Sequence, residues 1–282
     1  MTLSTAPDRY CVMGNPVEHS RSPAIHARFA ELTGQRIDYG RHCVPLRGFA
    51  DAVQRFAALG GRGCNVTVPF KFEAFALASR HSVRATLAGA ANTLLFTPEG
   101  IDADNTDGAG LVADIERNAG LALAGRALLL VGAGGAAAGV LGSLIAAGPA
   151  RVLVVNRSAD KAHALVRRHA ALAREHGVAL AAGALGDAHE PFDVVINGTA
   201  SSLAGDAVPV AADVLRPGTL AVDMMYGPAA QGFLDWARAH GAVPRDGLGM
   251  LVEQAAQSFA LWRGVRPPAA RVLAELRASL AA

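Results

Sequence analysis

Residues 127–137 read ALLLVGAGGAA, and this stretch decides the fold of the chain around it. The run from Leu128 to Val131 is aliphatic and stops at a glycine, which predicts a buried β-strand followed by a turn. The following residues fit the pattern G-x-G-x-x-A, in which a tight turn and a close backbone approach to a pyrophosphate open a helix. The stretch therefore predicts a phosphate-binding turn, whose contacts come from Gly132, Ala133, Gly134, Gly135 and Ala136.

Two other interpretations of this region stay open. In a chain rich in Ala and Gly, a glycine turn can pack without holding a ligand. Residues 127–150 also carry no charged side chain and are long enough to cross a bilayer as a helix. Against a membrane span, the glycines that follow the aliphatic run are typical of a strand, a turn and a helix.

The same alternation continues toward the C-terminus. Apolar runs predict strands at residues 127–131, 151–155, 194–196 and 219–222, with helical segments between them. This order of elements is typical of a doubly wound nucleotide-binding domain.

The end of the second of these strands indicates which dinucleotide the site prefers. A site for NAD usually carries Asp or Glu there, because a carboxylate accepts from the ribose 2′-hydroxyl. This chain has Asn156, Arg157 and Ser158 instead, and Lys161 lies one helical turn further on. A guanidinium binds a 2′-phosphate with two parallel hydrogen bonds, so the pattern predicts NADP. Asp160 is a possible counter-argument, but it falls inside the next turn and not at the strand end. The alternative is that Arg157 and Lys161 are surface cations without a ligand.

The first hundred residues also alternate between strands and helices. Apolar runs and helical spacing predict strands at 10–13, 37–44, 63–68 and 91–96, with helices at 23–32 and 49–59. Because helices separate the strands, we expect a parallel α/β sheet.

The tail from Leu248 to Ala282 is helical in pattern and breaks at Pro267-Pro268. Gly247-Leu248-Gly249 is typical of a hinge, so we expect the tail to return to the first domain. The expected fold is α/β with two domains. Residues 1–107 plus 248–282 form an N-terminal α/β substrate domain, and residues 108–247 form a doubly wound Rossmann-type NADP domain.

Composition excludes several classes of protein. Of the 282 residues, 51% are hydrophobic and 18% charged, which argues against disorder. The net charge of +2 and the scattered basic residues argue against nucleic-acid binding. Cys11, Cys43 and Cys64 are odd in number and lack metal-ligand spacing, so we expect free thiols in a reducing compartment. Met1–Arg9 shows no apolar signal segment, and the predicted location is cytoplasmic.

Four segments outside the nucleotide domain are polar where a core element would be apolar. They are residues 20–23 (SRSP), 65–71 (NVTVPFK), 91–93 (ANT) and 104–108 (DNTDG). Polar groups at strand ends and helix starts converge on a ligand, so these segments predict a second site.

With these segments in place, the sequence resembles the shikimate dehydrogenase family, which interconverts 3-dehydroshikimate and shikimate. The matching segments occur in family order along nearly the whole chain: residues 14–16 with 19–23, 65–71, 89–94, 105–108, 132–137, 156–158, 223–228, and 247–252 with 254–256.

The resemblance implies a role for each polar residue. Ser20 and Ser22 would hold the substrate carboxylate, with a further hydroxyl from Tyr226, although one serine capping the helix at Pro23 is the plainer alternative. Thr67, Asn92 and Gln254 would hydrogen-bond the ring hydroxyls.

Lys71 and Asp107 would be the catalytic pair, also in contact with substrate. Lys71 would exchange a proton with the substrate oxygen, and Asp107 would orient its ammonium. An interdomain salt bridge is the structural alternative. The resemblance further implies that Thr199, Met224 and Gly247 line the nicotinamide.

Three functional alternatives remain. A broader quinate/shikimate dehydrogenase differs from the first assignment only in tolerance of substrate or cofactor. A non-catalytic NADP-binding sensor would have lost Lys71 or Asp107, and both are present. A membrane protein would depend on residues 127–150. The expected partner is a small-molecule substrate, with no nucleic acid and no membrane, and a homodimer is left open.

Overall fold

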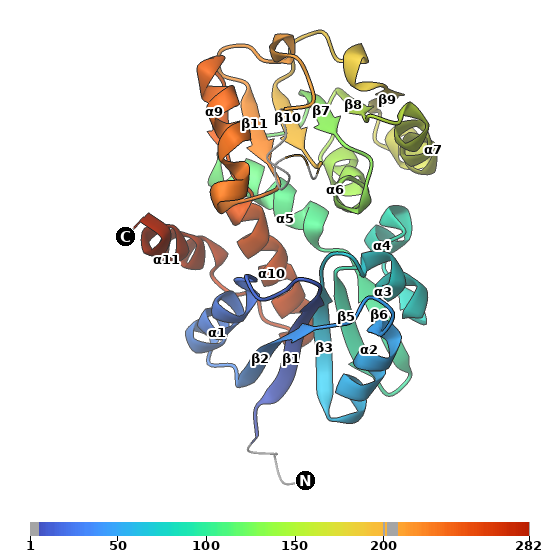
Figure 1. Ribbon diagram of the computed structural model, residues 1–282, viewed down its shortest axis with the longest axis vertical. Coiled ribbons are helices and arrows are strands. Elements are labelled where there is room, and N and C mark those ends of the chain that lie inside the picture. The colour runs from blue at the N-terminus through green and yellow to red at the C-terminus, as the bar shows by residue number, and fades with distance from the viewer. Residues whose placement is uncertain (1–5, 200, 202–207, 282) are drawn as a thin grey trace. The chain divides into compact units, whose positions relative to one another are not determined.

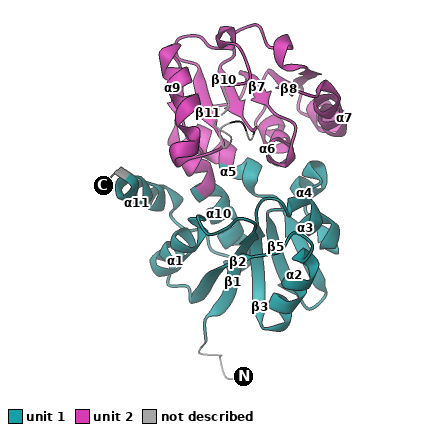
Figure 2. Cartoon of the chain, viewed as in Figure 1, with its two compact units in different colours: residues 1–110, 252–282 teal, residues 111–251 magenta. Residues whose placement is uncertain are grey.

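The chain forms two compact units in the computed structural model, which describes residues 6–199, 201 and 208–281. Unit 1 contains residues 1–110 and 252–282, and unit 2 contains residues 111–251 (Figure 2). The domain limits expected from the sequence, 107/108 and 247/248, lie a few residues before these boundaries. The reason is that each boundary falls inside a continuous helix, α5 (Asp107–Ala113) or α10 (Leu248–Arg263), where no loop marks it.

Unit 1 is one sheet with helices packed on it (Figure 1). Its strands are β1 (Asp8–Gly14), β2 (Ile37–Cys43), β3 (Gly61–Val66), β4 (Arg80–His81), β5 (Thr93–Thr97) and β6 (Gly100–Asp104). Its other helices are α1 (Ser22–Thr33), α2 (Phe49–Ala58), α3 (Lys71–Leu77), α4 (Val83–Ala88) and α11 (Ala269–Ala281).

The sheet of unit 1 is mixed, so the expectation of a parallel sheet is wrong here. The strand order is β2-β1-β3-β5-β6-β4, and β5 runs antiparallel to both β3 and β6. The β5–β6 hairpin was missed because Pro98-Glu99 joins two strands of which only the first is strongly apolar. The hairpin matters for the site, because it returns the chain to the edge at which β3 ends.

Alternating side chains give unit 1 a core on each face of the sheet. On one face, Cys11 and Met13 of β1 pack in a buried cluster with Phe49 and Val53 of α2. On the other face, the Tyr10 ring stacks on that of Trp262 in α10 with centroids 4.6 Å apart. The tail therefore belongs to the core of unit 1.

Unit 2 is a six-stranded sheet in which every pairing is parallel. Its strands are β7 (Ala127–Val131), β8 (Arg151–Val155), β9 (Ala179–Gly183), β10 (Val194–Asn197), β11 (Leu220–Asp223) and β12 (Val243–Arg245). Its helices are α6 (Gly135–Ala146), α7 (Ala159–Glu175) and α9 (Gln231–Ala239), with a π-helical turn η1 (Asp114–Asn118) and 3-10 turns η2 (Leu185–Asp187), η3 (Ala212–Val214) and η4 (Gly227–Ala230).

The strand order β12-β11-β10-β7-β8-β9 is that of a doubly wound dinucleotide fold, which confirms the expected class. The β7 run is aliphatic throughout because both of its faces are buried: Leu128 and Leu130 join one core cluster, and Leu129 and Val131 join the other. The sequence prediction missed β9 and β12, which are the two edge strands; β9 is rich in Ala, and β12 has three residues with a proline.

The membrane interpretation of residues 127–150 is wrong. That segment forms β7, a glycine turn and α6. Among the helices of the described ranges, none combines the length and the apolar character that a bilayer crossing needs. The predicted absence of a signal segment concerns Met1–Arg9, of which residues 1–5 lie outside the described residues.

Candidate functional site

The mixed topology of unit 1 brings four chain segments to one edge of its sheet. This edge is the one formed by the ends of the strands, and it does not run along an outer strand. β1 and β3 are parallel and both end there, at Gly14 and Val66. β5 begins at this edge because it is antiparallel, with Thr93 opposite both Asn65 of β3 and Asp104 of β6. The polar segments predicted from the sequence therefore follow or precede strands at a single edge.

Lys71 and Asp107 form an ion pair at this edge. Lys71 Nζ donates to Asp107 Oδ2 at 2.5 Å, and the two side chains are 19% and 8% exposed. Each residue begins a helix, Lys71 in α3 and Asp107 in α5, and the N-terminal end of α5 favours a carboxylate. Both partners lie within unit 1, so the alternative of an interdomain salt bridge is wrong.

The Asn92 amide connects this pair to the ring-binding residues expected from the sequence. Its Nδ2 lies 2.8 Å from Asp107 Oδ1, 2.9 Å from Thr106 Oγ1 and 3.1 Å from Gln254 Oε1. An amide nitrogen carries two hydrogens, so it satisfies at most two of these three acceptors at once. Thr106 Oγ1 also lies 3.4 Å from Gln254 Oε1 and can donate to it, so the two amides, the hydroxyl and the carboxylate form one connected network.

Two buried hydroxyls complete the cluster: Thr93, which lies in the predicted polar segment 91–93 but was given no role, and Ser258, which was not predicted. The Oγ atoms of Thr93 and Ser258 lie 2.7 Å apart, and Asn65 Nδ2 donates to Ser258 Oγ at 3.0 Å. Ser258 follows Gln254 by four residues on α10, so the two share one helix face. This four-residue spacing from Gln254 was the signal in the sequence from which Ser258 could have been predicted.

Asp104 anchors the loop that carries Asp107. Burial raises the pKa of Asp104, but hydrogen bonds from Arg84 and Ser82 lower it more, and the net pKa lies below its usual value. The same carboxylate accepts from the backbone N–H of Asn105 at 2.7 Å. The loop is thus held by a charged group rather than by apolar packing.

Ser20 and Ser22 lie between β1 and the first turn of α1. Ser22 is 6% exposed and is the first residue of α1, whose N-cap is Arg21 without a side-chain cap. The alternative in which Ser22 caps this helix is therefore wrong, whereas Ser20 Oγ accepts from the Ser22 N–H at 3.3 Å.

Thr67 lies just after β3, beside the end of β1. Its methyl group occupies the space that a Cβ at Gly14 would need. The Thr67 hydroxyl has no hydrogen-bond partner in the described part of the chain.

The predicted phosphate-binding turn of unit 2 lies between β7 and α6, at the point where the strand order reverses. Gly132 has φ +113°, and a Cβ there would lie 3.0 Å from the Gly198 carbonyl oxygen, so the position requires glycine. A Cβ at Gly134 would meet nothing within 4 Å, which leaves open space at the N-terminus of α6. Ala137 is fully buried against the sheet. These features fit a dinucleotide pyrophosphate.

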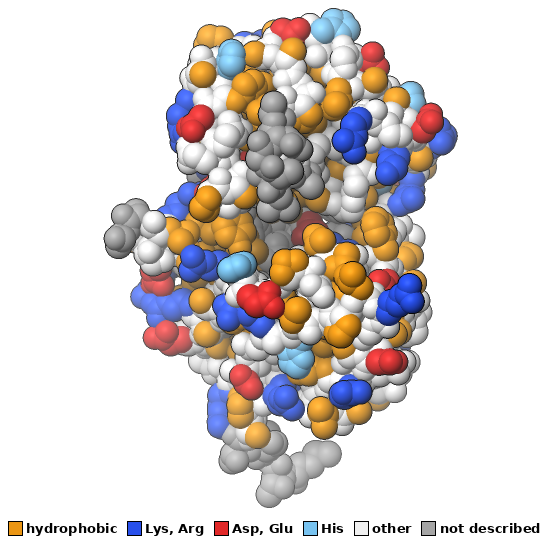
Figure 3. All heavy atoms as spheres, viewed as in Figure 1, with side chains coloured by type: hydrophobic (Ala, Val, Ile, Leu, Met, Phe, Trp, Pro, Cys, Tyr) orange, Lys and Arg blue, Asp and Glu red, His pale blue; other side chains and the backbone are white. Residues whose placement is uncertain are grey.

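The cations predicted to bind a 2′-phosphate follow β8. Arg157, Ser158 and Lys161 are exposed, and Asn156 Nδ2 donates to the Ser158 carbonyl oxygen at 3.0 Å. Neither Arg157 nor Lys161 has a carboxylate partner among residues 6–199, 201 and 208–281. In Figure 3, basic side chains gather over the part of unit 2 that carries α7.

The residues predicted to line the nicotinamide follow β10, β11 and β12 at the same edge of the sheet. Thr199 Oγ1 donates to Asn197 Oδ1 at 2.7 Å. The Gly247 N–H donates to the Met225 carbonyl oxygen at 2.8 Å, and a Cβ at Gly247 would overlap the Met224 carbonyl. Tyr226, predicted to reach the substrate, is half-buried in unit 2 at the start of η4.

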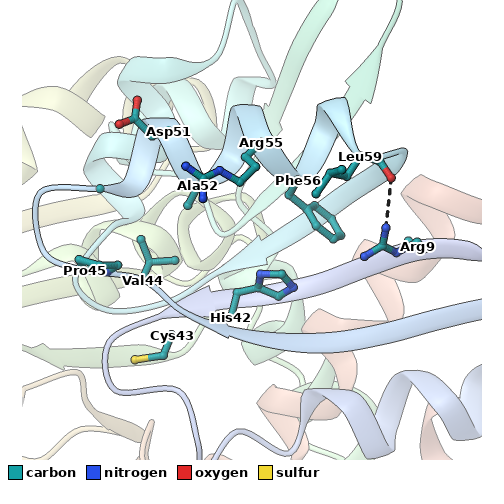
Figure 4. A pocket seen from close by; sticks show the side chains of 11 residues that line it. Arg9, His42, Cys43, Val44, Pro45, Asp51, Ala52, Arg55, Phe56 and Leu59 are labelled. Atoms are coloured by element: carbon teal, nitrogen blue, oxygen red, sulfur yellow. Dashed lines mark hydrogen bonds between the residues drawn. The ribbon is translucent and has the colours of Figure 1, made fainter.

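A hollow of about 360 Å³ in unit 1 is separate from these residues (Figure 4). It lies between β2 and α2, where His42 and Phe56 meet edge to face with centroids 5.1 Å apart. None of the site residues predicted from the sequence lines it.

Comparison with known proteins gives consistent matches along the chain. Three family models match: the shikimate dehydrogenase substrate binding domain at residues 12–94, shikimate / quinate 5-dehydrogenase at 114–208, and the shikimate 5′-dehydrogenase C-terminal domain at 247–277. A shikimate dehydrogenase (NADP(+)) from Paracidovorax citrulli (strain AAC00-1) is 68% identical over 99% of this chain and 100% of its own length.

Two solved structures extend this similarity to the fold. An Ael1 enzyme from Pseudomonas putida is 44% identical with a TM-score of 0.87, over 95% of this chain and 98% of its own. A shikimate 5-dehydrogenase from Thermus thermophilus, in complex with NADP(H) and shikimate, is 33% identical with a TM-score of 0.80, over 96% and 99% of the two chains.

Proposed function

This chain belongs to the NADP-dependent shikimate dehydrogenase family, and from that membership we propose how its side chains divide the work of the reaction. The enzyme reduces 3-dehydroshikimate reversibly to shikimate with NADP, in the pathway to the aromatic amino acids. Unit 1 is assigned the substrate and unit 2 the dinucleotide. The single observation that carries the assignment is the contact of Lys71, Asp107, Asn92 and Gln254 in one buried cluster.

Substrate binding is assigned to residues at the edge of the unit 1 sheet. Ser20 and Ser22 receive the carboxylate, and the family resemblance adds a hydroxyl from Tyr226, which belongs to unit 2. The ring hydroxyls go to Thr67, whose own hydroxyl has no partner among the described residues, and to the Asn92 and Gln254 amides. The convergence of both amides with the Asp107 carboxylate in one buried network supports this assignment, because these groups donate to and accept from hydroxyls.

Lys71 is assigned the proton transfer. Reduction of a ketone places negative charge on its oxygen, and an ammonium beside that oxygen stabilises the charge and delivers a proton. Asp107 keeps the Lys71 ammonium in place at 2.5 Å, while Asn92 holds the other oxygen of the same carboxylate. In the reverse direction Lys71 receives the proton.

The dinucleotide is assigned to the edge of unit 2. Gly132, Ala133, Gly134, Gly135 and Ala136 surround the pyrophosphate, Thr199, Met224 and Gly247 line the nicotinamide, and Asn156, Arg157, Ser158 and Lys161 take the 2′-phosphate. When bound, NADPH supplies the hydride that reduces the carbonyl carbon. The protein orients it and leaves Arg157 exposed for the phosphate.

Arg157→Ala is expected to raise KM for NADP by roughly 10–100-fold, because a charge-assisted hydrogen bond contributes about 1.5–3 kcal/mol. KM for NAD should hardly change, since NAD lacks the 2′-phosphate. Steady-state rates with each cofactor measure both values. Arg174→Ala, at an exposed position of α7, is the matched control and should leave both constants unchanged. Equal losses with NADP and NAD would refute the 2′-phosphate role.

The experiment that tests the function is an absorbance assay at the nicotinamide band, with shikimate or quinate and with NADP or NAD. Rapid reduction of the cofactor is expected with shikimate and NADP alone. Comparable rates with quinate or NAD would assign the protein to the broader quinate/shikimate group. No activity in any combination would favour a non-catalytic NADP sensor.

A cytoplasmic location is proposed from the cysteines. Cys11 and Cys64 are buried, directly paired neighbours on β1 and β3, and yet they are free thiols, as is exposed Cys43. Free thiols persist in a reducing compartment. Fractionation of the native cells tests the location. The oligomeric state is a separate question, and light scattering of the purified protein distinguishes a homodimer from a monomer.

A further inference from the structure

His26 is a buried polar group that the proposed reaction does not use. It lies on α1, four residues after Ser22, and its side chain is fully buried. Within the described part of the chain, neither Nδ1 nor Nε2 has a hydrogen-bond partner. Burial lowers the pKa of His26 to about 3; the neighbouring Asn65 side chain raises it slightly as a hydrogen-bonding group, although the two side chains do not have the geometry of a hydrogen bond. The ring is therefore uncharged at neutral pH and keeps one N–H donor that is not used.

The surroundings of His26 are aromatic apart from Asn65. Its ring stacks on Tyr39 with centroids 4.2 Å apart and an interplanar angle of 5°. Trp262 lies at 5.4 Å and Phe259 at 6.1 Å from the ring. An unsatisfied N–H is unfavourable in such surroundings. A phenyl ring would fill the same space without that cost, so packing alone does not account for an imidazole here.

Tyr39 links His26 to the substrate residues. Its hydroxyl donates to Asn65 Oδ1 at 2.7 Å, and Ser22 is close enough to lower the pKa of Tyr39 against the larger effect of burial. Asn65 Nδ2 in turn donates to Ser258 Oγ at 3.0 Å. The phenol thus stands between Ser22, which is assigned the carboxylate, and the cluster around Asn92, which is assigned the ring hydroxyls.

The number of protons in this group limits what it can do when a carboxylate arrives. A phenol has one proton, so Tyr39 can donate to Asn65 or to a carboxylate at Ser22, but not to both. If the phenol turns to the carboxylate, Asn65 Oδ1 loses its donor in a buried place. The unused N–H of His26 is then the donor next to Asn65 that can replace it.

We propose that His26 is a positioning residue for substrate binding, which holds the Asn65 amide when Tyr39 turns to the bound carboxylate. The inference deepens the proposed function and rests on the assignment of Ser22. On this proposal His26 contributes to the affinity for shikimate, whereas it does not contribute to the stability of the folded enzyme without substrate.

The test is steady-state kinetics and thermal unfolding of the full chain with His26→Phe. KM for shikimate should rise about tenfold, the effect of one buried hydrogen bond, while kcat and KM for NADP stay within about twofold. The melting temperature should stay the same or rise. His26→Gln, which keeps an N–H donor, should recover most of the affinity for shikimate, and this recovery is one that a purely structural role would not produce.

His169 offers a matched control in unit 2. It is also fully buried, on α7, and its Nε2 lacks a partner within residues 6–199, 201 and 208–281. His169→Phe should leave KM for shikimate unchanged. An unchanged KM in His26→Phe, or equal KM values in His26→Phe and His26→Gln, would overturn the inference while Ser22→Ala still raises KM. An unchanged KM in Ser22→Ala would instead overturn the carboxylate assignment on which the inference rests.

Discussion

Lys71→Ala is expected to lower kcat by roughly 10²–10⁴-fold, the usual contribution of a positioned proton donor. KM for shikimate should change modestly, because the carboxylate and most ring hydroxyls are assigned to other side chains. The reason lies in the short contact of Lys71 Nζ with Asp107 Oδ2 at 2.5 Å, which fixes the ammonium at the edge of the sheet. Absorbance at the nicotinamide band, with both substrates saturating, measures kcat.

Two further variants sharpen this result. Glu73→Ala changes an exposed residue in the first turn of the same helix and should keep wild-type kcat. The double variant Lys71→Ala with Asp107→Ala should be little slower than the slower single variant, because residues that act as a unit are not additive. A nearly unchanged kcat in Lys71→Ala would remove Lys71 from the mechanism.

Arg245→Met is expected to destabilise the folded protein by about 3–5 kcal/mol, the usual effect of leaving one member of a buried ion pair alone. Arg245 Nε and Nη2 bind the Asp114 carboxylate at 2.6 and 2.5 Å, and the Asp114 side chain is fully buried. A Cβ at Gly249 would overlap this carboxylate, so the start of α10 packs directly against it. Denaturant unfolding monitored by circular dichroism measures the loss.

The exposed pair Arg238–Asp235 on α9 provides the control for this prediction. Its side chains are 53% and 60% exposed, so Arg238→Met should cost at most about 1 kcal/mol. Asp114→Asn combined with Arg245→Met should be more stable than Arg245→Met alone, because the amide removes the uncompensated charge. A loss in Arg245→Met as small as that in Arg238→Met would show that the buried pair contributes little.

The sequence by itself determined the nucleotide-binding unit, and it predicted the residues that are assigned to the two sites. ALLLV followed by glycines predicts a strand buried on both faces and a phosphate-binding turn, and β7 and Gly132 agree with this. Such features are local, since they depend on side-chain periodicity and on the conformational freedom of glycine. The segments 65–71, 91–93 and 104–108 were likewise recognisable from their polar residues next to apolar runs.

Only the tertiary structure decided how the polar residues meet. The antiparallel direction of β5 places Asn92 and Thr93 beside the ends of β3 and β6, and α10 adds Ser258 from the far end of the chain. Strand direction and contacts between distant segments depend on which pairing buries the most surface and satisfies the most hydrogen bonds. No local pattern records that choice, and for the same reason the sequence showed neither the Asp114–Arg245 pair nor the place of His26 under Tyr39.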